Sequence, residues 1–392
     1  MRKNMVWENA CQSEILLADS KGNFNGKRLA SIDPDLALQS PFPRLIDEWQ
    51  EVPSIWDAVR SNVDRDDAKG KYILTGSATI NRDSCIHSGC GRIARLKMRT
   101  MSLLESGSSS GLISLKDICL GNADEALTGE VSLEALMELV LKGGWPSLLN
   151  GNYQDGMLLA KEYINAVLDT DIYRVDGTKR AKHKVELLLR SLARNEATTA
   201  TNKKLMNDIS EIDCASVSID TITNYLELCQ ILFLTENIPP FSSKLPSSLR
   251  VKQAEKRHFA DPSLPCALLG LSKGKLLEDL EFFGFLFESL AESDLLAYAE
   301  SFHAKLYHYQ DYDGNEIDAV IELDDLSWCG VEIKVGANQI DEASANLIRI
   351  NESIIRHGGK GARALMVICG MSDAAYRRKD GVYVVPLTAL RD

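Results

Sequence analysis

The sequence has no run of about 18 consecutive uncharged apolar residues, the length that a membrane-spanning helix needs. Its first residues, MRKNMVWENACQSEILL, also lack the continuous apolar core of a secretion signal. Neither a membrane span nor export is therefore indicated, and we expect a cytoplasmic protein. At 392 residues the chain is long enough for two or three domains, each with a core of its own.

Positively charged residues are in deficit. The chain has 44 Lys and Arg residues against 56 Asp and Glu residues, which gives a net charge of −12. This charge favours solubility and opposes indiscriminate binding to nucleic acid or to acidic membranes. Any contact with nucleic acid must therefore come from a local basic surface.

Clustered cysteines are nearly absent. Most of the nine cysteines stand alone in apolar surroundings, among them Cys229, Cys266, Cys329 and Cys369. This distribution is typical of reduced core residues and not of a disulfide framework. Only the hexapeptide CIHSGC, which ends at Cys90, groups side chains that bind metals. Because no second pair occurs at zinc-ligand spacing, we interpret it as a solvated loop.

The first hundred residues alternate short apolar runs with helical patterns, as an α/β layer does. After Pro53-Ser54, apolar residues recur at helical spacing at Ile55, Trp56, Val59 and Val63. The run KYILTGSAT then predicts a buried strand, which completes a strand-helix-strand unit. The stretch SGSSSG, residues 106–111, is a low-complexity break and predicts a boundary. The segment that follows is expected to be helical and to stop at Gly143-Gly144.

From about residue 179 the pattern becomes three helices and a strand, in KHKVELLLRSLARNEA, NKKLMNDI, SIDTITNYLELCQ and ILFLTENI. This order suits a winged helix-turn-helix, whose third helix is the candidate groove reader. Residues 179–204 contain eight basic against two acidic residues, a local charge of +6. The residues that we expect to contact nucleic acid are Lys182, Lys184, Lys203 and Lys204.

The third helix of this segment lacks Arg and Lys. Its polar residues include Asp220, Thr221, Thr223 and Asn224, so no arginine or lysine can make a bidentate contact to guanine. If the segment binds DNA, we expect phosphate contacts and not sequence readout. A small packing module with a solvated basic face is an equally weighted alternative.

The last third of the chain carries the most specific chemistry. A long helix, GKLLEDLEFFGFLFESLAESDLLAYA, places Glu288 on one stripe with Gly284 and Leu295, at the edge of an apolar face. A hairpin follows, with strands AKLYHYQ and EIDAVIEL around a turn at Asp313-Gly314, and then a strand WCGVEIKVG. A helix, QIDEASANLIRINESIIRH, and two strands, ALMVICG and GVYVVPL, complete the pattern.

Strand alternation brings charged side chains of this region together. Asp318 points away from the apolar face of its strand, and Glu332 and Lys334 point the same way on the next strand. Two carboxylates on neighbouring strands can hold Mg²⁺, and a lysine beside them can orient a water or stabilise charge on a phosphate. We therefore predict a metal site at Asp318 and Glu332, with Lys334 and Glu288 as further catalytic residues. A salt-bridged surface strand is the alternative.

The pattern of Asp318 and Glu332-x-Lys334, preceded by a helical Glu288, resembles the restriction-endonuclease-like (PD-(D/E)XK) nuclease superfamily. In that superfamily the Asp and Glu bind the metal, and the Lys assists hydrolysis of a phosphodiester. The resemblance implies a metal-dependent nuclease-like core with DNA as its partner.

Motifs along most of the chain, from about residue 30 onward, resemble a prokaryotic family of AAA-type ATP-binding proteins. Members end in a domain of unknown function that combines a winged helix with a nuclease-like core. The motifs are LIDEWQEVPSIWDAVRSNVDR, YILTGSAT, GRIARLKMRTMSLLESG, GGWP, YINAVLDTDI and HFADPSLPCALLG. Several motifs in the same order make the resemblance specific.

This resemblance implies ATPase roles for residues in the first hundred. Asp47 corresponds to the Walker B carboxylate that holds Mg²⁺, and Glu48 to the acidic residue that polarises the attacking water. Thr75 or Ser77 corresponds to a polar sensor, and Arg92 to an arginine that senses the γ-phosphate. These roles agree with what phosphoryl transfer needs. Without the resemblance, Asp47-Glu48 indicates a strand end that leads into an acidic first helical turn.

The phosphate-binding loop of such an ATPase, G-x-x-x-x-G-K-[ST], is missing from the sequence. The nearest string, GNFNGKRL, has one residue too few between its glycines and has Arg28 where Ser or Thr coordinates Mg²⁺. We therefore predict no ATP turnover and expect that the start of the ATPase domain was lost by truncation, gene decay or a misplaced start codon. A loop encoded in frame upstream of Met1 would instead make the protein a working ATPase.

The sequence thus predicts an α/β protein in four parts. These are an incomplete AAA-type ATPase core (1–105), a helical linker or lid (106–178), a winged helix-turn-helix (179–250) and a PD-(D/E)XK nuclease-like domain (251–392). We expect Mg²⁺-assisted phosphodiester hydrolysis in the last part. The alternative is a non-catalytic module that binds DNA or protein, with the nuclease-like core as a scaffold. A protein partner or a second copy of the chain is compatible with either.

Overall fold

The computed structural model describes residues 10–20, 22–65, 68–76, 91–171, 179–212, 217–241 and 254–392. The chain is mixed α/β, which confirms the predicted fold class. It divides into two compact units, Met1–Met98 and Arg99–Asp392. The first unit therefore ends seven residues before the expected boundary at residue 105. Across these described residues, no helix combines the length and the apolar character that a membrane crossing requires.

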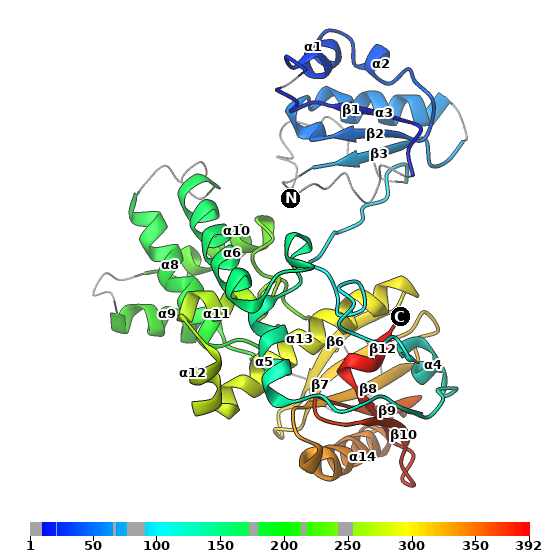
Figure 1. Cartoon of the computed structure of the whole chain (residues 1–392), viewed down its shortest axis with the longest axis vertical. Helices are drawn as coiled ribbons and strands as arrows, with labels where there is room; N and C mark the ends of the chain where they lie inside the picture. The colour runs from blue at the N-terminus through cyan, green and yellow to red at the C-terminus, as the bar shows by residue number, and fades with distance from the viewer. Residues whose placement is uncertain are drawn as a thin grey trace. The chain divides into compact units, whose positions relative to one another are not determined.

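A three-stranded parallel sheet forms the centre of the first unit (Figure 1). Its strands, in sheet order, are β1 (Ser13–Leu16), β2 (Arg44–Asp47) and β3 (Tyr72–Thr75). Its helices are α1 (Asn25–Ile32), α2 (Pro34–Ala37) and α3 (Ser54–Arg65). The predicted strand-helix-strand unit is thus present as β2, α3 and β3. The apolar residues of α3 that were predicted to share a face are buried at Ile55, Trp56 and Val59.

The second unit contains a seven-stranded mixed sheet. Its strands, in sheet order, are β5 (Ala126–Leu127), β10 (Ala374–Arg377), β11 (Tyr383–Pro386), β9 (Ala364–Cys369), β8 (Trp328–Lys334), β7 (Glu316–Glu322) and β6 (Lys305–Gln310). The pairs β6-β7 and β7-β8 are antiparallel, whereas β8-β9 and β9-β11 are parallel. The predicted hairpin and the strands after it are therefore present, and β10 was not predicted.

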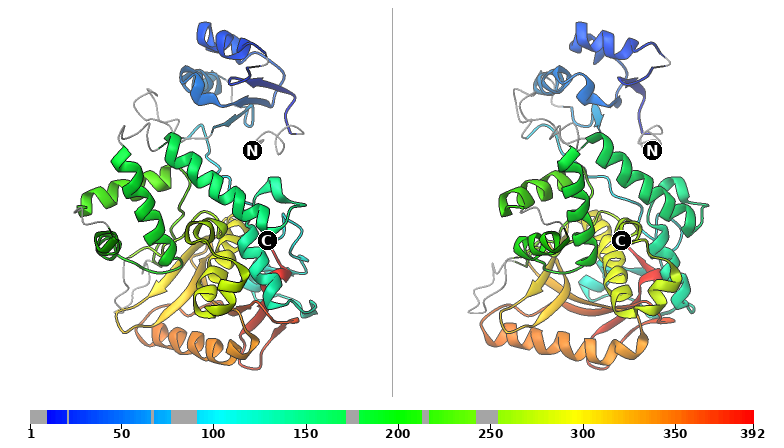
Figure 2. Two further views of the ribbon diagram at one scale, coloured as in Figure 1. Left: turned by 60° about the vertical axis from the view of Figure 1, so that its left-hand side comes forward. Right: turned by 90° about the vertical axis from the view of Figure 1, so that its left-hand side faces the viewer.

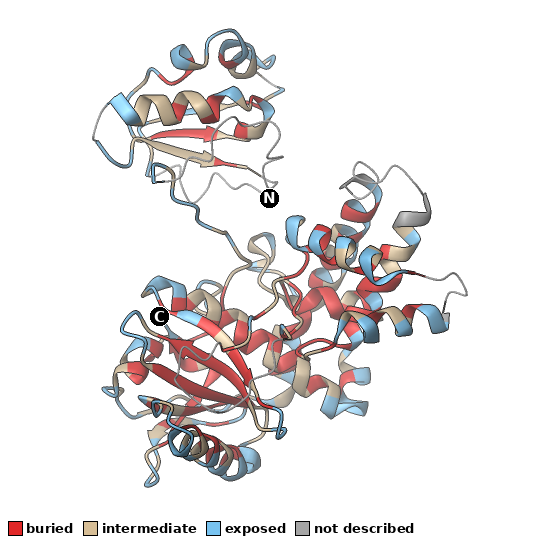
Figure 3. Cartoon of the chain, turned by 180° about the vertical axis from the view of Figure 1, so that it is seen from behind, coloured by how far each residue is buried: buried red, intermediate tan, exposed pale blue. Residues whose placement is uncertain are grey.

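Two helices cover opposite faces of this sheet (Figure 2). α13 (Leu280–Ser301) packs against the face that carries Ala319, Val331 and Met366, and α14 (Ile340–Arg356) packs against the face that carries Val320 and Val367. Since both faces are covered, the central strands are buried along their length, as Figure 3 shows. A charged side chain on β7 or β8 therefore lies inside the protein unless it is near a strand end.

The long helix predicted from Gly274 is broken in two. α12 (Lys273–Glu278) ends before Asp279, and α13 begins after it. The Asp279 carboxylate accepts a hydrogen bond from the Phe282 N–H at 2.9 Å, which caps the new helix. A side chain of this kind competes with the helical backbone and starts a helix more readily than it continues one.

The serine-rich stretch 106–111 is packed against the end of the chain and is not a boundary. The Ser109 hydroxyl donates to the Leu390 carbonyl at 2.6 Å, and the Ser110 N–H donates to the Thr388 carbonyl at 2.8 Å. Directly after the stretch, β4 (Ile113–Ser114) pairs with β12 (Leu390–Arg391). The helices that follow, α4 (Leu115–Leu120) and α5 (Leu133–Lys142), share one apolar core with α13 and the sheet.

The helices between 153 and 269 form a second apolar core in this unit. They are α6 (Tyr153–Ala166), α8 (Lys179–Arg194), α9 (Asn202–Ile212), α10 (Ile219–Ile231) and α11 (Ser263–Leu269), and we call the described residues of 153–269 the helical module. Three helices were predicted from 179, and α8, α9 and α10 lie there. The predicted strand ILFLTENI differs, because its first residue still belongs to α10 and only Thr235 and Ile238 make isolated bridges.

A buried carboxylate ties the start of the second unit to α13. Asp294 accepts the Leu103 N–H at 3.0 Å and the Tyr298 hydroxyl at 3.2 Å. It is 2% exposed. Burial raises the pKa of this carboxyl from 3.8 to about 7. Because the folded protein favours the protonated acid, the stability that this group contributes is complete at acidic pH and is lost as the pH rises toward 7.

We expect Asp294→Asn to remove this pH dependence. A pKa unit corresponds to about 1.4 kcal/mol, so between about pH 4 and pH 8 the wild type should lose on the order of 4 kcal/mol relative to the variant. Urea unfolding of both proteins across this range measures the difference. Asp313→Asn, at an exposed turn, is the matched control. Parallel stability curves for wild type and Asp294→Asn would contradict the assignment.

Candidate functional site

Asp318, Glu332 and Lys334 lie together on one side of the β7-β8 pair. Ala319 lies opposite Val331 in the ladder, so Asp318 is opposite Glu332. The Lys334 Nζ is 3.1 Å from Asp318 Oδ2 and 2.7 Å from Glu332 Oε2. The prediction that these side chains share a face is therefore confirmed. The Lys334 side chain is 27% exposed, so the group reaches solvent at this residue.

Backbone and amide groups hold the two carboxylates. The Ile333 N–H donates to Asp318 Oδ2 at 2.7 Å. The Asn346 Nδ2, on α14, donates to Glu332 Oε1 at 2.9 Å and to the Glu316 carbonyl at 3.2 Å. Asn346 was not predicted as a site residue. Its position on α14 becomes apparent only once that helix is packed on the sheet.

The two carboxylates differ in their electrostatics. Burial raises the pKa of Asp318, but the charges of Lys334 and Lys256 outweigh burial and hold it below its usual value. Burial and the Asp318 charge together raise the pKa of Glu332 to about 8. Burial lowers the pKa of Lys334, yet the two carboxylates raise it well above its usual value. Near neutral pH, Asp318 and Lys334 are thus charged, and Glu332 still takes up a proton.

Glu288 belongs to a neighbouring cluster around Lys256. The Lys256 ammonium contacts Glu288 Oε1, lies 2.9 Å from Glu292 Oε1 and donates to the Asp318 carbonyl at 3.0 Å. Glu288 therefore joins Asp318 through Lys256. Burial raises the pKa of Glu288 well above its usual value, and the Asp318 and Glu292 charges add to the rise.

Ion pairs continue from Glu292 into the helical module. Glu292 Oε2 lies 2.9 Å from His258 Nε2, and His258 Nδ1 lies 3.2 Å from Glu196 Oε1. Glu196 also accepts the Ser289 hydroxyl at 2.7 Å. Burial alone would lower the pKa of His258, but the two carboxylates raise it to about 9. His258 is therefore a cation at neutral pH.

Sequence reasoning missed the residues of this series of ion pairs, namely Glu196, Lys256, His258 and Glu292. One signal was present, because Glu292 follows Glu288 by one helical turn and lies on the same side of α13. Glu196 is one of the two acidic residues in the basic stretch 179–204, and it is 1% exposed. No local pattern indicates that Lys256 reaches α13, since 32 residues separate it from Glu288.

The donor atoms suit a hard divalent cation. Asp318 and Glu332 supply two carboxylates, and Mg²⁺ in proteins is commonly held by one or two carboxylates together with water. Within the described ranges, no three or more His, Cys, Asp and Glu side chains are grouped closely enough to hold a metal. A zinc site or a calcium cage, which need more protein ligands, does not fit this arrangement. CIHSGC lies outside the described residues.

The residues of the first unit that resemble an ATPase site are partly assembled. Asp47 and Thr75 end neighbouring parallel strands, and the Thr75 hydroxyl donates to Asp47 Oδ1 at 2.6 Å. Glu48 adopts a left-handed conformation with φ 53° and contacts Gln50. Arg92 forms an ion pair with Asp64 of α3 at 2.6 Å. Ser77 lies outside the described residues.

The string GNFNGKRL lies at the start of α1, after β1. In the described part of this unit, β1 pairs with β2, and β2 lies between β1 and β3. The Lys27 Nζ, from the string, is 2.6 Å from Glu51 Oε2. This lysine is therefore already paired with a carboxylate.

The predicted nucleic-acid contacts are partly neutralised. Lys182 pairs with Asp169, and the Lys204 Nζ is 3.7 Å from Asp208 Oδ1. Lys203 is exposed, and Lys184 is half-buried. The free positive charge of this surface is therefore smaller than the count of basic residues indicates.

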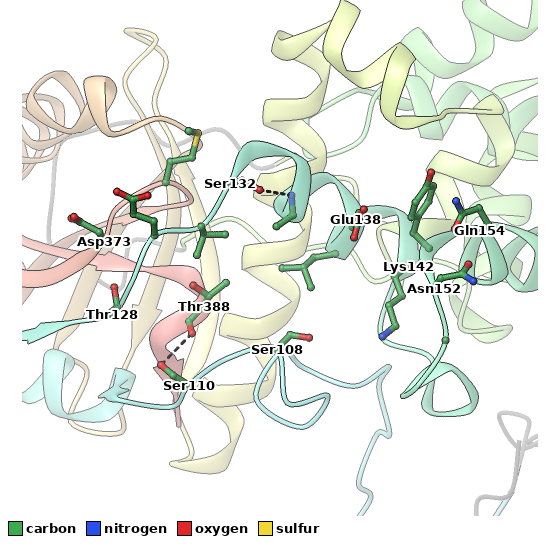
Figure 4. Close-up of a pocket in the computed structure, with 17 residues that line it drawn as sticks. Ser108, Ser110, Thr128, Ser132, Glu138, Lys142, Asn152, Gln154, Asp373 and Thr388 are labelled. Atoms are coloured by element: carbon green, nitrogen blue, oxygen red, sulfur yellow. Dashed lines mark hydrogen bonds between the residues drawn. The ribbon is translucent and has the colours of Figure 1, made fainter.

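A groove of about 1360 Å³ runs along α5, away from these residues (Figure 4). Hydroxyl groups line it at Ser108, Ser110, Thr128, Ser132 and Thr388. None of the site residues predicted from the sequence lines it. It therefore contributes nothing to the Asp318 site.

Two segments match known family models. Residues 133–275 match a domain of unknown function (DUF8612), and residues 283–390 match another domain of unknown function (DUF4143). The comparison with curated proteins found no match. The first segment contains Lys256 and His258, and the second contains Glu288, Asp318 and Glu332. The charged cluster thus joins residues of two segments that match different family models.

We expect Lys334→Met to destabilise the second unit by about 2 kcal/mol at about pH 6, because it leaves the buried Asp318 carboxylate without its cation and removes the partner of Glu332. Loss of the cation also raises the pKa of Glu332 beyond about 8, so the destabilisation should be larger at about pH 9. Urea unfolding at the two pH values measures it. Lys305→Met, at an exposed position of β6, is the control. An equal loss at both pH values would contradict the pairing.

Proposed function

We propose that the second unit is a Mg²⁺-dependent, nuclease-like module that hydrolyses phosphodiester bonds of DNA. One observation carries the proposal: Asp318 and Glu332 are opposite each other on neighbouring strands, and Lys334 lies within hydrogen-bonding distance of both. Asp318 and Glu332 are buried, and the group reaches solvent at Lys334. This arrangement of two carboxylates and a lysine supports a role in metal-assisted attack on a phosphodiester.

Each residue has a chemical role in this proposal. Asp318 and Glu332 would hold the metal, which when bound polarises a phosphate oxygen and lowers the pKa of a water. Lys334 would give up its contact with one of the two carboxylates. Its ammonium group would then orient the attacking water or stabilise the charge that develops on the phosphate. Asn346 keeps Glu332 in place through its hydrogen bond. Glu288 stays in the neighbouring cluster, held by Lys256.

Two further observations support this reading. The order α13, β6, β7, β8, α14 and β9 places an acidic helix before a three-stranded antiparallel segment and a crossover to a parallel strand. This is the order that the sequence pattern led us to expect of a restriction-endonuclease-like core. The domain matched over 283–390 is also often linked to AAA-type ATPases. The first unit would then be an ATPase-related segment.

Calorimetric titration with Mg²⁺ and Mn²⁺ tests the metal site. We expect the wild type to bind and Asp318→Ala to bind at least about tenfold more weakly, because one of two carboxylate ligands is lost. Asp313→Ala, at the exposed turn before β7, should bind like the wild type. Cleavage of plasmid DNA should follow the same order and stop when the metal is chelated. Equal and absent binding in wild type and Asp318→Ala would remove the metal site.

A non-catalytic DNA-binding module is the second candidate. It is favoured by Lys256, whose buried ammonium group stabilises Glu288 and Glu292 without any metal. Here the helical module would contact phosphates through Lys203 and Lys204. We propose this function if DNA binds without being cut.

Neutralising Lys203 and Lys204 to Gln tests the DNA surface. Two lost phosphate contacts should reduce the slope of log affinity against log salt by about 2 and weaken binding equally for all sequences. Fluorescence anisotropy with labelled duplex DNA at several salt concentrations measures the slope. Lys273→Gln and Lys275→Gln together, on α12, give a control with the same loss of charge. An unchanged slope places the DNA contact elsewhere.

A further inference from the structure

Lys256 belongs to the helical module, yet its charged end lies in the sheet-containing core. It lies in the described residues 254–259, which isolated bridges attach to the module. The bridged pairs are Thr198 with Arg257, Thr235 with Phe259, and Ile238 with Lys256. The backbone of Lys256 is therefore bridged to the module, and its side chain reaches α13 and β7.

The ammonium group has as many acceptors as hydrogens. An ammonium has three N–H donors, and Lys256 uses them on Glu288, Glu292 and the Asp318 carbonyl. The side chain is 1% exposed, so water does not replace these contacts. Losing the lysine would leave three acceptors buried without their donor, which makes a different arrangement of the cluster costly.

The third contact bears directly on the acidic site. Asp318 accepts a hydrogen bond at its carbonyl, from Lys256 at 3.0 Å. Its carboxylate accepts from the Ile333 N–H at 2.7 Å and from Lys334 at 3.1 Å. β7 begins only two residues earlier, at Glu316. Backbone near the end of a strand opens readily, and a metal site needs its ligands held to about 0.5 Å. The contact from Lys256 supplies that restraint at the end of β7.

Further contacts hold the partners of Lys256 in place. Its partner Glu292 lies 2.9 Å from His258 Nε2, and His258 Nδ1 lies 3.2 Å from Glu196, directly after α8. The Phe259 N–H also donates to Glu196, at 3.2 Å. Residues 256–259 therefore contact both α13 and the residue Glu196 that follows α8. The position of the ammonium group thus depends on the packing of the module.

We propose that Lys256 is the positioning residue of the acidic site, so that the site is complete only when the helical module is packed against the sheet. The module supplies the cation, and the sheet and α13 supply Asp318, Glu332 and Glu288. The site would then be shared between the two segments that match different family models. The inference rests on the proposed function for the presence of a metal. The hydrogen bond from Lys256 that restrains Asp318 does not depend on a metal.

The test uses three variants of the full chain. Lys256→Met removes the charge and keeps the length of the side chain. Lys256→Met with Glu292→Gln removes one charge of each sign, so that any loss of charge balance is compensated while the contact to the Asp318 carbonyl is still missing. Lys273→Met, in an exposed ion pair with Glu138, is the matched control. Circular dichroism establishes that each variant is folded.

Two readouts are needed. Amide hydrogen exchange at Ile333 reports the placement of the Asp318 carboxylate without metal, with the amide of Leu347 in α14 as an internal reference. Calorimetric titration with Mg²⁺ reports the site itself. In both Lys256 variants we expect exchange at Ile333 to be faster by about tenfold and Mg²⁺ affinity to fall by about tenfold to a hundredfold, as for other residues that orient metal ligands. Lys273→Met should match the wild type in both.

The outcomes separate the two proposals. If the double variant regains wild-type exchange at Ile333 and wild-type Mg²⁺ affinity, Lys256 only balances charge and the positioning role is overturned. Unchanged exchange at Ile333 in folded Lys256→Met overturns it as well. If the wild type binds no Mg²⁺ while exchange at Ile333 still accelerates in the variants, the proposed function fails and the positioning role stands.

Discussion

A buried lysine ammonium group needs a hydrogen-bond acceptor for each of its three N–H groups. The second unit contains one such buried group, on Lys256. Lys256 finds two carboxylates on α13 and a carbonyl on β7. These partners lie in separate stretches of the chain, so the ion cluster forms only when the helical module, the helix and the sheet are in place together. Removing one member would leave uncompensated buried charge, which is far more costly than losing an exposed pair.

The site at the β7-β8 pair depends on the register of the two strands as well. Side chains alternate between the faces of a strand, so a slip of one residue would carry Glu332 and Lys334 to the face covered by α13. The aliphatic residues that alternate with Glu332 and Lys334 hold the register, because Val331 and Ile333 are buried in the core beneath α13. Apolar packing on one face thereby aligns the charged residues on the other. Asn346 and Lys334 then limit the repulsion between the two carboxylates.

The differences between the predicted and the observed elements have a common cause. Asp279 interrupts an apolar helical pattern because its own side chain caps the next helix. The serine-rich stretch is ordered because Ser109 and Ser110 find carbonyls at Leu390 and Thr388, nearly three hundred residues along the chain. Composition indicates a loop in that stretch, but it carries no information on a hydrogen-bond partner so distant in sequence. The same limit applies to Lys182 and Lys204, whose charges are partly cancelled by carboxylates.

By itself, the sequence determined the α/β class, most strands and helices of the last third, and the shared face of Asp318, Glu332 and Lys334. These follow from periodicity, since a strand repeats every two residues and a helix about every 3.6. Only the tertiary structure decided that Glu288 is held by Lys256, that His258 and Glu196 extend the cluster, and that Asn346 supports Glu332. Such contacts join segments that no local period relates, because they arise from the packing of whole helices and sheets.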